Sequence, residues 1–321
     1  MKVLITGGAG FIGSHLAEYL LRRGDRVVIV DELNDYYSPA LKRENLATVR
    51  QAGEIEFHEV DICEAEAIPR IVEASRPDAI VHLAARAGVR PSLELPLLYE
   101  RVNVHGTMVL LEASRKFGVK KFVFASSSSI YGLANRVPFS EEDHNNLPIS
   151  PYAATKLAGE KVCYTYSHLY GLPVVCLRFF TVYGPRQRPD LAIRKFTERI
   201  DQGLPIPVFG DGSSGRDYTF VADTVGGIVG ALGYEGQYDI FNLGNSRPVK
   251  LTELIEAIEG AVGKKAVIEW LPDQPGDVPI TYADISKAGR MLGYAPRTPF
   301  ATGIERFVEW YRAGRAKGLA V

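Results

Sequence analysis

The chain has 321 residues, of which 46% are hydrophobic and 23% are charged, a composition typical of a globular protein with a large core. Its net charge of −1 gives no reason to expect nucleic acid or an anionic membrane surface as a partner. The three cysteines are widely separated without metal-ligand spacing, so we expect neither disulfides nor a metal site. No apolar run approaches the ~20 residues that span a bilayer and no cleavable leader precedes the first expected strand, so a cytoplasmic location is expected.

The first half of the chain alternates short apolar runs with helix-like segments. The expected strands lie at residues 3–5, 27–30, 79–83, 122–125 and 174–178. Helices are expected between them, for example over residues 14–23 and 104–117. Such continuous apolar runs suit strands that are covered on both faces, and parallel strands require crossover helices. The pattern therefore predicts the α/β class, with a doubly wound parallel sheet of the Rossmann type.

The character of the sequence changes after about Gly184, where proline and glycine become more frequent and the strands become short. Helices are expected again over residues 252–262 and 302–312. We interpret residues 1–184 as the sheet-forming domain, with later excursions of the chain allowed, and residues 185–321 as a smaller mixed α/β domain. We expect the second domain to lie over the carboxyl edge of the sheet, where open α/β sheets bind their ligands.

A glycine-rich turn follows the first strand and opens a helix. Gly7 allows the tight turn, Gly10 lets the backbone approach a pyrophosphate, and Gly13 allows the helix to pack closely on the strand. The first helical residues, Phe11 and Ile12, then present backbone N–H groups to the phosphates. A glycine-rich turn by itself is weak evidence for a dinucleotide site, because many such matches are ordinary turns.

An acidic residue strengthens the dinucleotide interpretation. Asp31 ends the second strand about 20 residues further on, where a carboxylate can accept both hydroxyls of a ribose. Glu32 adds negative charge, and no arginine follows at once to accept a 2′-phosphate, which favours NAD over NADP. The alternative is that Asp31 is a solvated loop acid or a helix cap.

Two other strand ends are expected beside the dinucleotide. Their residues are Asp61, Ile62, Leu83, Ala84 and Ala85. The first two can frame the adenine, and the small residues of the second let the backbone lie against the coenzyme. His82 precedes this segment, and we interpret it as a core histidine with satisfied hydrogen bonds rather than as a ligand or a base.

The segment Ser150-Pro151 predicts a helix start, and Tyr152 and Lys156 then share one helical face. A free tyrosine has a pKa of about 10, too high for a base at neutral pH. A nearby ammonium and the positive nicotinamide of NAD+ favour the phenolate and lower that pKa. Lys156 can also donate to the nicotinamide ribose. By itself such a pair is more often found on the surface of an amphipathic helix.

Four consecutive serines follow the strand expected at 122–125. They are Ser126, Ser127, Ser128 and Ser129. At the carboxyl edge of the sheet their hydroxyls can bind a sugar hydroxyl and pass on its proton, and the alternative is a serine-rich turn. With Tyr152 and Lys156 they predict a redox enzyme. A non-catalytic NAD-binding sensor is an alternative of a different class, and loss of Tyr152 or Lys156 would have favoured it.

Together these motifs resemble the extended short-chain dehydrogenase/reductase family, in its nucleotide-sugar epimerase and dehydratase branch. The matching segments span nearly the whole chain and include residues 103–107, 178–185 and 215–218. The resemblance implies tightly held NAD in the first domain and a nucleoside-diphosphate sugar in the second. The catalytic residues that it implies are Ser127, Tyr152 and Lys156. The further coenzyme contacts that it implies are Asn103, Ser126 and Phe179.

The serine run discriminates among the reactions of this branch. The dehydratases that it resembles carry an Asp-Glu pair at the positions of Ser128 and Ser129, and related decarboxylases carry a Glu at the second position. This chain has neither acid, so elimination and decarboxylation lack their proton-transfer group. What remains is C4 epimerisation of a UDP-sugar through a transient 4-keto intermediate, in which NAD takes a hydride and returns it within one turnover.

The sugar is indicated by residues 178–190, which closely resemble the UDP-glucuronate 4-epimerases. Galactose epimerases usually carry asparagine where this chain has Thr181. With Ser128 and Ser129, this threonine can hydrogen-bond a C6 carboxylate. We therefore expect conversion of UDP-glucuronate to UDP-galacturonate, with the UDP-glucose/UDP-galactose pair as the alternative.

The other substrate contacts implied by the resemblance lie mostly in the second domain. Arg216 is the expected pyrophosphate ligand, because guanidinium groups match phosphate geometry. Asp277 matches a ribose-binding acid. Relatives often carry an arginine where Gln274 stands, so one phosphate contact is missing or supplied elsewhere. The remaining expected substrate contacts are Arg90, Arg186, Arg188 and Val208.

The resemblance also implies a homodimer built on a four-helix bundle, from the helices near residues 96–117 and 152–170. The leucines and valines of the first helix fit such an interface. A face buried within one chain would show the same pattern, so both interpretations stay open.

Overall fold

A seven-stranded parallel sheet forms the centre of the computed structural model, which describes residues 1–133, 136–143, 146–272 and 280–316. Its order is β10-β6-β5-β4-β1-β2-β3. The strands are β1 (Lys2–Thr6), β2 (Arg26–Val30), β3 (Ile55–His58), β4 (Ala79–His82), β5 (Lys121–Ser127), β6 (Val174–Phe179) and β10 (Tyr238–Leu243). The chain moves outward from β1 in one direction and from β4 in the other, so the sheet has a switch point between these two strands, where open α/β sheets bind ligands.

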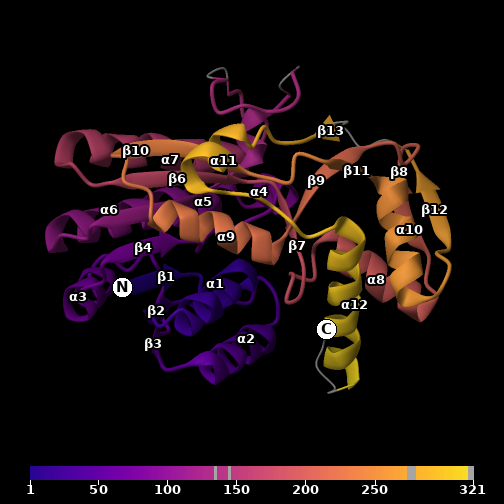
Figure 1. Ribbon diagram of the computed structural model, residues 1–321, viewed down its shortest axis with the longest axis horizontal. Helices are drawn as coiled ribbons and strands as arrows, with labels where there is room; N and C mark the ends of the chain where they lie inside the picture. The colour runs from indigo at the N-terminus through magenta and orange to yellow at the C-terminus, as the bar shows by residue number, and fades with distance from the viewer. Residues whose placement is uncertain (134–135, 144–145, 273–279, 317–321) are drawn as a thin grey trace.

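Helices cover both faces of this sheet (Figure 1). One face packs on α1 (Phe11–Arg22), α2 (Pro39–Ala52), α9 (Val221–Leu232) and α11 (Ser286–Leu292). The other packs on α3 (Ala67–Ser75), α6 (Gly106–Phe117) and α7 (Pro151–Tyr170). Successive residues of β1 enter different hydrophobic clusters: Val3 and Ile5 belong to the first, and Leu4 belongs to the second. A strand that buries both faces explains why the sequence reads as a continuous apolar run.

Short helices follow β4 and β5 at the carboxyl edge of the sheet. They are α4 (Val89–Glu94), α5 (Pro96–Glu100), the π-helix η1 (Arg101–His105) and the 3-10 helix η2 (Ser128–Tyr131). The helix α7 begins as the sequence predicts: the Ser150 side chain accepts a hydrogen bond from the Ala153 backbone N–H at 3.2 Å, and Pro151 occupies the first turn.

A smaller region of short strands and helices lies beside the sheet (Figure 1). Its helices are α8 (Ala192–Gln202), α10 (Leu251–Val262) and α12 (Phe300–Ala316). Its strands are β7 (Thr181–Tyr183), β8 (Ile206–Phe209), β9 (Gly215–Phe220), β11 (Pro248–Lys250), β12 (Ile268–Leu271) and β13 (Ile280–Thr281). These elements share a separate hydrophobic cluster that includes Phe196, Ile258 and Phe307.

The predicted fold class is confirmed, because the expected strands form one parallel sheet with helices on both faces. The helices expected at 252–262 and 302–312 are α10 and α12. The division of the chain at residue 184 stays a prediction. The strand β10 lies beyond that position and pairs with β6, which is the kind of later excursion that the sequence left open.

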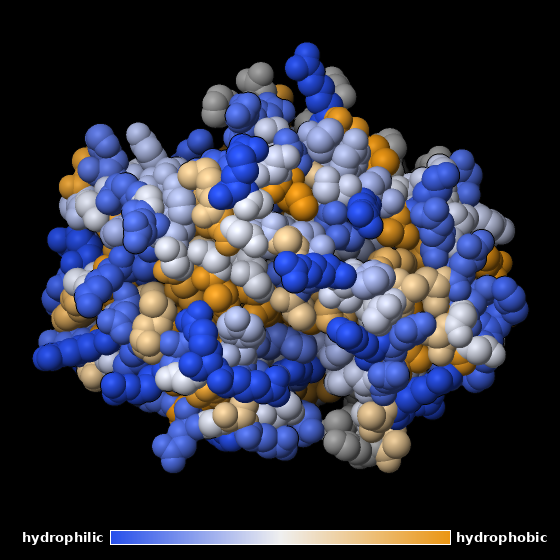
Figure 2. All heavy atoms as spheres, viewed as in Figure 1, coloured by the Kyte–Doolittle hydropathy of each residue, from blue (hydrophilic) through white to orange (hydrophobic). Residues whose placement is uncertain are grey.

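The surface visible in Figure 2 is covered mostly by hydrophilic side chains, with apolar side chains in small areas between them. This is the usual distribution for a protein face in contact with water. In the described part of the chain, no helix combines the length and the apolar character that crossing a bilayer requires.

Candidate active site

A cavity of about 510 Å³ lies at the carboxyl edge of the seven-stranded sheet, a size usual for sites of small molecules and cofactors. Residues that follow β1, β2, β4, β5 and β6 line it. The structure brings together most of the residues that the sequence singled out. They are Gly7, Gly10, Phe11, Ile12, Gly13, Asp31, Asp61, Ile62, Leu83, Ala84, Ala85, Ser126, Ser127, Ser128, Ser129, Tyr152, Lys156, Phe179, Thr181 and Arg188.

One end of the cavity is formed by the glycine turn. Gly7 has a φ of 69°, and a Cβ there would lie 2.8 Å from the Ala84 backbone nitrogen. A Cβ on Gly13 would lie 2.2 Å from the Gly7 carbonyl oxygen. Gly10 is the N-cap residue of α1, and no side chain caps this helix. The turn therefore packs closely against its own backbone and leaves the first turn of α1 available to a phosphate group.

Asp31 is held in place beside this turn. Its carboxylate accepts hydrogen bonds from the backbone N–H groups of Ala9 at 3.1 Å and Leu33 at 3.0 Å, and the residue is only 8% exposed. Burial raises the pKa of this carboxyl group, and the two backbone hydrogen bonds oppose that rise. A buried carboxylate with fixed orientation in a cavity differs from the solvated loop acid that was the alternative.

Lys42 also lines this end, and the sequence did not reveal it. Its ammonium donates to the Asn34 carbonyl oxygen at 2.8 Å and to the Asn34 side-chain oxygen at 2.9 Å. Burial lowers its pKa, and the charge of Asp31 opposes that change. The lysine lies in α2, where it reads as one charge of a solvated helix, so no local signal marks it.

Asn103 does not line the cavity but orients a segment that does. Its side chain accepts from the Arg86 backbone N–H at 2.8 Å and donates to the Arg86 carbonyl at 3.0 Å. It also donates to the Thr155 hydroxyl at 3.0 Å. The expected contact of Asn103 with the coenzyme stays a prediction. In this structure the side chain holds the segment that follows β4, whose residues Ala84 and Ala85 line the cavity.

His82 is a core residue, in agreement with its interpretation from the sequence. Its ring nitrogens lie 2.7 Å from the Thr6 hydroxyl and 3.0 Å from the Thr107 hydroxyl. Complete burial, followed by the charge of Lys156, lowers its pKa to about 3, so the ring is neutral at physiological pH.

Tyr152 and Lys156 lie one helical turn apart at the start of α7, and both line the cavity. The Lys156 ammonium donates to the Ala125 carbonyl at 2.7 Å and lies 5.1 Å from the centre of the Phe124 ring. Burial lowers the pKa of Lys156 to about 8, whereas the charges of Cys163 and Glu160 act in the opposite direction. The lysine is thus a buried cation that is fixed at the end of β5.

The pKa of Tyr152 is raised by burial, and this differs from the expected lowering. A hydrogen bond with Ser127 and the charge of Arg188 oppose the rise. The Lys156 ammonium does not contribute to this balance, because it is directed at the Ala125 carbonyl. The cation that acts on the phenol in this structure is therefore the arginine.

The serine run has a structural role in addition to the expected one. Ser127 is the N-cap residue of η2: its hydroxyl accepts from the Ser129 backbone N–H at 3.2 Å and donates to the Ser129 hydroxyl at 3.1 Å. The serines thus form a turn, as the alternative interpretation held, and the same turn places their hydroxyls in the cavity.

Aromatic residues that the sequence did not single out surround the tyrosine. The hydroxyls of Tyr36 and Tyr99 both donate to the Ala87 carbonyl at 2.8 Å. The Tyr99 ring meets the Tyr152 ring edge-on at 6.2 Å, and the Arg188 guanidinium lies 5.5 Å from the centre of the Tyr36 ring. No local pattern marks this group, because Tyr36 lies in a polar loop and Tyr99 has the sequence context of a core residue.

Arg188 is held by an acidic neighbour. It donates to Asp190 at 2.9 and 2.8 Å, which is a bidentate ion pair. Burial opposes the charged form of this arginine, but the hydrogen bond and the charge of Asp190 raise its pKa. The guanidinium is therefore a fixed positive charge in the lining of the cavity.

Three arginines and one valine that are expected to contact the substrate lie outside the cavity lining. They are Arg90, Arg186, Arg216 and Val208, none of which lines the cavity. Arg186 donates to Glu18 on α1 at 3.1 Å and contacts His15 at 3.2 Å, so it turns away from the site. Val208 is fully buried in the core of the smaller region, where an alternating strand residue faces inward.

The two remaining arginines lie on the side of the smaller region. The Arg90 guanidinium lies 5.8 Å from the centre of the Phe209 ring, and Arg216 donates to the Gly215 carbonyl at 3.0 Å. The expected ribose contact Asp277 and the unusual Gln274 lie outside the described residues. Within the described residues, no three His, Cys, Asp or Glu side chains gather in a way that could hold a metal ion.

A parallel sheet with a glycine turn after β1 and a Tyr-Lys pair on α7 is the arrangement of the extended short-chain dehydrogenases/reductases. Residues 4–307 match the family model described as GDP-mannose 4,6 dehydratase, and the chain belongs to this family.

Similar proteins within this group have names that describe epimerases. The chain is 44% identical over 308 residues to a UDP-glucuronate 4-epimerase of Thermodesulfobacterium geofontis, which covers 96% of this chain and 95% of the relative. It is similar in structure to a UDP-glucuronic acid 4-epimerase of Bacillus cereus solved with UDP-glucuronic acid and NAD, with a TM-score of 0.90, 35% identity and coverage of 98% and 99%. A UDP-glucose 4-epimerase of Thermotoga maritima solved with UDP-glucose matches with a TM-score of 0.90, 35% identity and coverage of 98% and 100%.

Proposed function

We propose that this protein is an NAD-dependent UDP-sugar 4-epimerase that converts UDP-glucuronate to UDP-galacturonate through a transient 4-keto intermediate. The observation that carries the proposal is that Ser127, Tyr152 and Lys156 share one cavity with the glycine turn and Asp31. The similarity to UDP-glucuronate 4-epimerases over nearly the whole chain supports it.

The residues at the glycine end fit NAD. The backbone packs so closely at Gly7 and Gly13 that neither position has room for a side chain. The space beside the turn therefore stays open for a dinucleotide. The first turn of α1 would hold the pyrophosphate, Asp31 would accept the ribose hydroxyls, and Lys156 would donate to the nicotinamide ribose. Bound there, NAD supplies a hydride acceptor at the sugar C4 and returns the hydride.

The protein residues then have to move one proton. Tyr152 takes the proton from the O4 hydroxyl and returns it to the inverted alcohol, and Ser127 is the hydrogen-bonded neighbour that can relay it. The guanidinium of Arg188 favours the phenolate that this step requires, and the positive nicotinamide of bound NAD+ would add to its effect. Because burial alone raises the pKa of Tyr152, these cations are needed for the tyrosine to act as a base.

The carboxylate of glucuronate would lie beside the hydroxyl and guanidinium groups of the cavity lining. Thr181, Ser128 and Ser129 offer hydroxyl donors there, and Arg188 offers a fixed positive charge. No acid stands at the serine positions to drive elimination or decarboxylation. The alternative is interconversion of UDP-glucose and UDP-galactose, which the similarity to the Thermotoga maritima enzyme favours.

The experiment is to incubate the purified protein separately with UDP-glucuronate and with UDP-glucose, and to follow the C4 proton by NMR. We expect inversion with UDP-glucuronate and slower or no inversion with UDP-glucose. Inversion of UDP-glucose alone would overturn the choice of sugar. Bound NAD without inversion of either sugar would favour the non-catalytic sensor.

We also propose that two parts of the chain bind different ligands. Residues 1–184 would bind NAD, and residues 185–321 would bind the nucleotide of the sugar. Arg216 and Asp277 are the proposed ligands in the second part, with the guanidinium of Arg216 suited to a phosphate. Loss of UDP affinity in Arg216→Met, with NAD binding unchanged, would support this division, whereas unchanged affinity for UDP would contradict it.

We also propose that the protein is a cytoplasmic homodimer with a four-helix bundle formed by α5, α6 and α7 of two copies. Leu97, Tyr164 and Leu169 on these helices are 82%, 51% and 61% exposed, and a second copy would cover them. The free and buried cysteines fit a reducing compartment.

Light scattering after gel filtration tests the dimer. We expect twice the mass of one chain for the native protein and a single chain for Leu97→Lys. Leu204→Lys, at another exposed leucine outside these helices, should leave the mass unchanged. A native protein that elutes as a monomer would contradict the dimer.

A further inference from the structure

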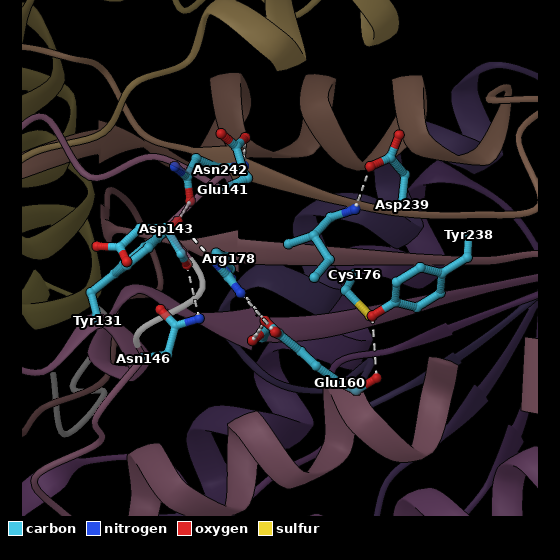
Figure 3. A network of polar contacts seen from close by, with 12 residues as sticks. Tyr131, Glu141, Asp143, Asn146, Glu160, Cys176, Arg178, Tyr238, Asp239 and Asn242 are labelled. Atoms are coloured by element: carbon cyan, nitrogen blue, oxygen red, sulfur yellow. Dashed lines mark hydrogen bonds and ion pairs between the residues drawn. The ribbon is translucent and has the colours of Figure 1, made fainter. Parts of the chain in front are cut away.

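A row of polar side chains crosses three neighbouring strands beneath α7. Ser126 of β5 is paired in register with Arg178 of β6, and Arg178 is paired with Asn242 of β10. Residues paired in adjacent parallel strands project to the same face of the sheet. Glu160 of α7 points toward Arg178 in this row, as Figure 3 shows. One helix residue therefore meets a continuous polar row inside an otherwise apolar face.

Glu160 is fully bonded. Its Oε1 accepts from the Ser126 hydroxyl at 2.5 Å and from Arg178 Nε at 2.9 Å, and its Oε2 accepts from Arg178 Nη2 at 2.9 Å. The side chains of Glu160 and Arg178 are 0% and 3% exposed. A buried ion pair adds little net stability compared with apolar residues of similar volume. It does, however, hold its two side chains in one fixed arrangement. Its presence is therefore explained better by positioning than by stability.

The other end of the arginine extends the row toward the loop after the serines. Arg178 Nη1 donates to the Tyr131 hydroxyl at 2.9 Å, and that hydroxyl donates to Asn242 Oδ1 at 2.8 Å (Figure 3). Tyr131 belongs to η2, which the hydroxyl of Ser127 caps. The guanidinium thus connects the helix α7 with both ends of the serine turn.

The helix and the strand end are joined at three successive points. Tyr152, Lys156 and Glu160 are spaced by four residues, so they lie along one face of α7. Each bonds a different one of three consecutive residues at the end of β5. The three pairs are Tyr152 with Ser127, Lys156 with Ala125, and Glu160 with Ser126.

The helix also lies too close to the strand for independent movement. A Cβ on Gly159 would lie 2.4 Å from the Phe124 ring. Of the ion pair and its partners, only Ser126 lines the cavity, so Glu160 and Arg178 act through other residues.

We propose that Glu160, held by Arg178, is a positioning residue that fixes the end of β5 against α7 and thereby sets how Tyr152 and Lys156 reach into the cavity. The inference rests on the proposed epimerase function. It predicts that loss of the ion pair lowers the rate of the chemical step more than it weakens substrate binding, because a small misplacement of reacting groups reduces the rate by up to about a hundredfold.

Two variants test the proposal. Glu160→Gln keeps the shape but removes the charge, and Glu160→Met/Arg178→Met replaces the whole pair with apolar residues so that no buried charge is left unpaired. The matched control is Asp239→Asn. Asp239 lies on the neighbouring strand β10 and is labelled in Figure 3. It forms an ion pair with Lys287 of α11 and accepts a hydrogen bond from the Tyr234 hydroxyl.

We expect kcat of the folded double variant to fall at least about tenfold, with KM changed by less than about threefold, while Asp239→Asn keeps both values near those of the wild type. Hydrogen exchange should become faster in the backbone of residues 125–129, a readout that does not depend on activity. A folded double variant with wild-type kcat and wild-type exchange would overturn the proposal. If the wild type inverts no sugar, the proposed function fails, and the exchange measurement still decides whether the pair positions the strand end.

Discussion

The glycine turn at one end of the cavity is built from backbone and small residues, whereas the lining around Tyr152 is built from long polar side chains. Gly7 and Ala84 follow neighbouring strands of one sheet, and Gly13 lies in the first turn of α1. The atoms nearest to a Cβ on either glycine are backbone atoms. Tyr152 and Arg188 come from segments that meet only after the chain has folded, and their contacts are between side chains. The glycine turn is therefore sensitive to volume, and the lining around Tyr152 is sensitive to charge and hydroxyl chemistry.

The largest effect is expected at Tyr152, in the polar part of the cavity lining. Tyr152→Phe removes the hydroxyl that is proposed to accept the O4 proton, so kcat should fall by about a thousandfold or more. Binding of NAD should persist, because the glycine end does not depend on this hydroxyl. Turnover measured by NMR and bound NAD measured by absorbance after denaturation check both statements. Epimerisation at the native rate would show that another group is the base.

A substitution at the glycine end should have the reverse signature. Gly13→Ala places a methyl group 2.2 Å from the Gly7 carbonyl oxygen, so the turn has to shift. We expect a loss of about 1–3 kcal/mol in the free energy of unfolding and weaker NAD binding. Gly226→Ala in α9 is the matched control, since a Cβ there would have no atom within 4 Å. This substitution should stabilise the helix by about 0.5–1 kcal/mol. Equal stability of the two variants in urea would contradict the close packing at Gly13.

The same contrast explains what the sequence could predict. The strands of the sheet are local patterns and were placed correctly. The glycine turn and Asp31 are also local patterns and lie in the cavity, while their contacts with a coenzyme stay predictions. The partners of Tyr36, Tyr99 and Lys42 depend on tertiary contacts, which no local pattern encodes. Arginines were the least predictable, because a long flexible side chain can turn either way.

Two neighbouring arginines show this difference. Arg186 and Arg188 are equally plausible substrate ligands by sequence, yet the first pairs with Glu18 on α1 and the second lines the cavity. Arg188→Met should lower kcat/KM for UDP-glucuronate by about ten- to hundredfold, through loss of a charged hydrogen bond. NAD binding should not change. Arg186→Met should have a smaller effect on kcat/KM, and a larger effect than at Arg188 would contradict the placement of the two side chains.

The smallest effect concerns pH and Lys156, whose ammonium donates to the Ala125 carbonyl at the end of β5. Burial lowers the pKa of Lys156 to about 8 from 10.5, with the charges of Cys163 and Glu160 on α7 opposing that change, and with His82 on β4 neutral. The ammonium is therefore present below about pH 8 and lost above it, so kcat should fall by up to about tenfold per pH unit in that range. The contribution of Lys156 to the free energy of unfolding changes with pH in the opposite direction.

Between about pH 8 and 10.5 the unfolded lysine still binds a proton that the folded lysine has released, so stability from this group rises with pH while activity falls. Thermal unfolding of the wild type and of Lys156→Met, compared at pH 8 and 9.5, isolates this term, because the other titrating groups are common to both proteins. Lys156→Arg keeps its charge throughout the range and should lose the alkaline fall in kcat. An alkaline fall that persists in Lys156→Arg would assign it to a different group, and the lysine would then serve only as the anchor of α7 on the Ala125 carbonyl.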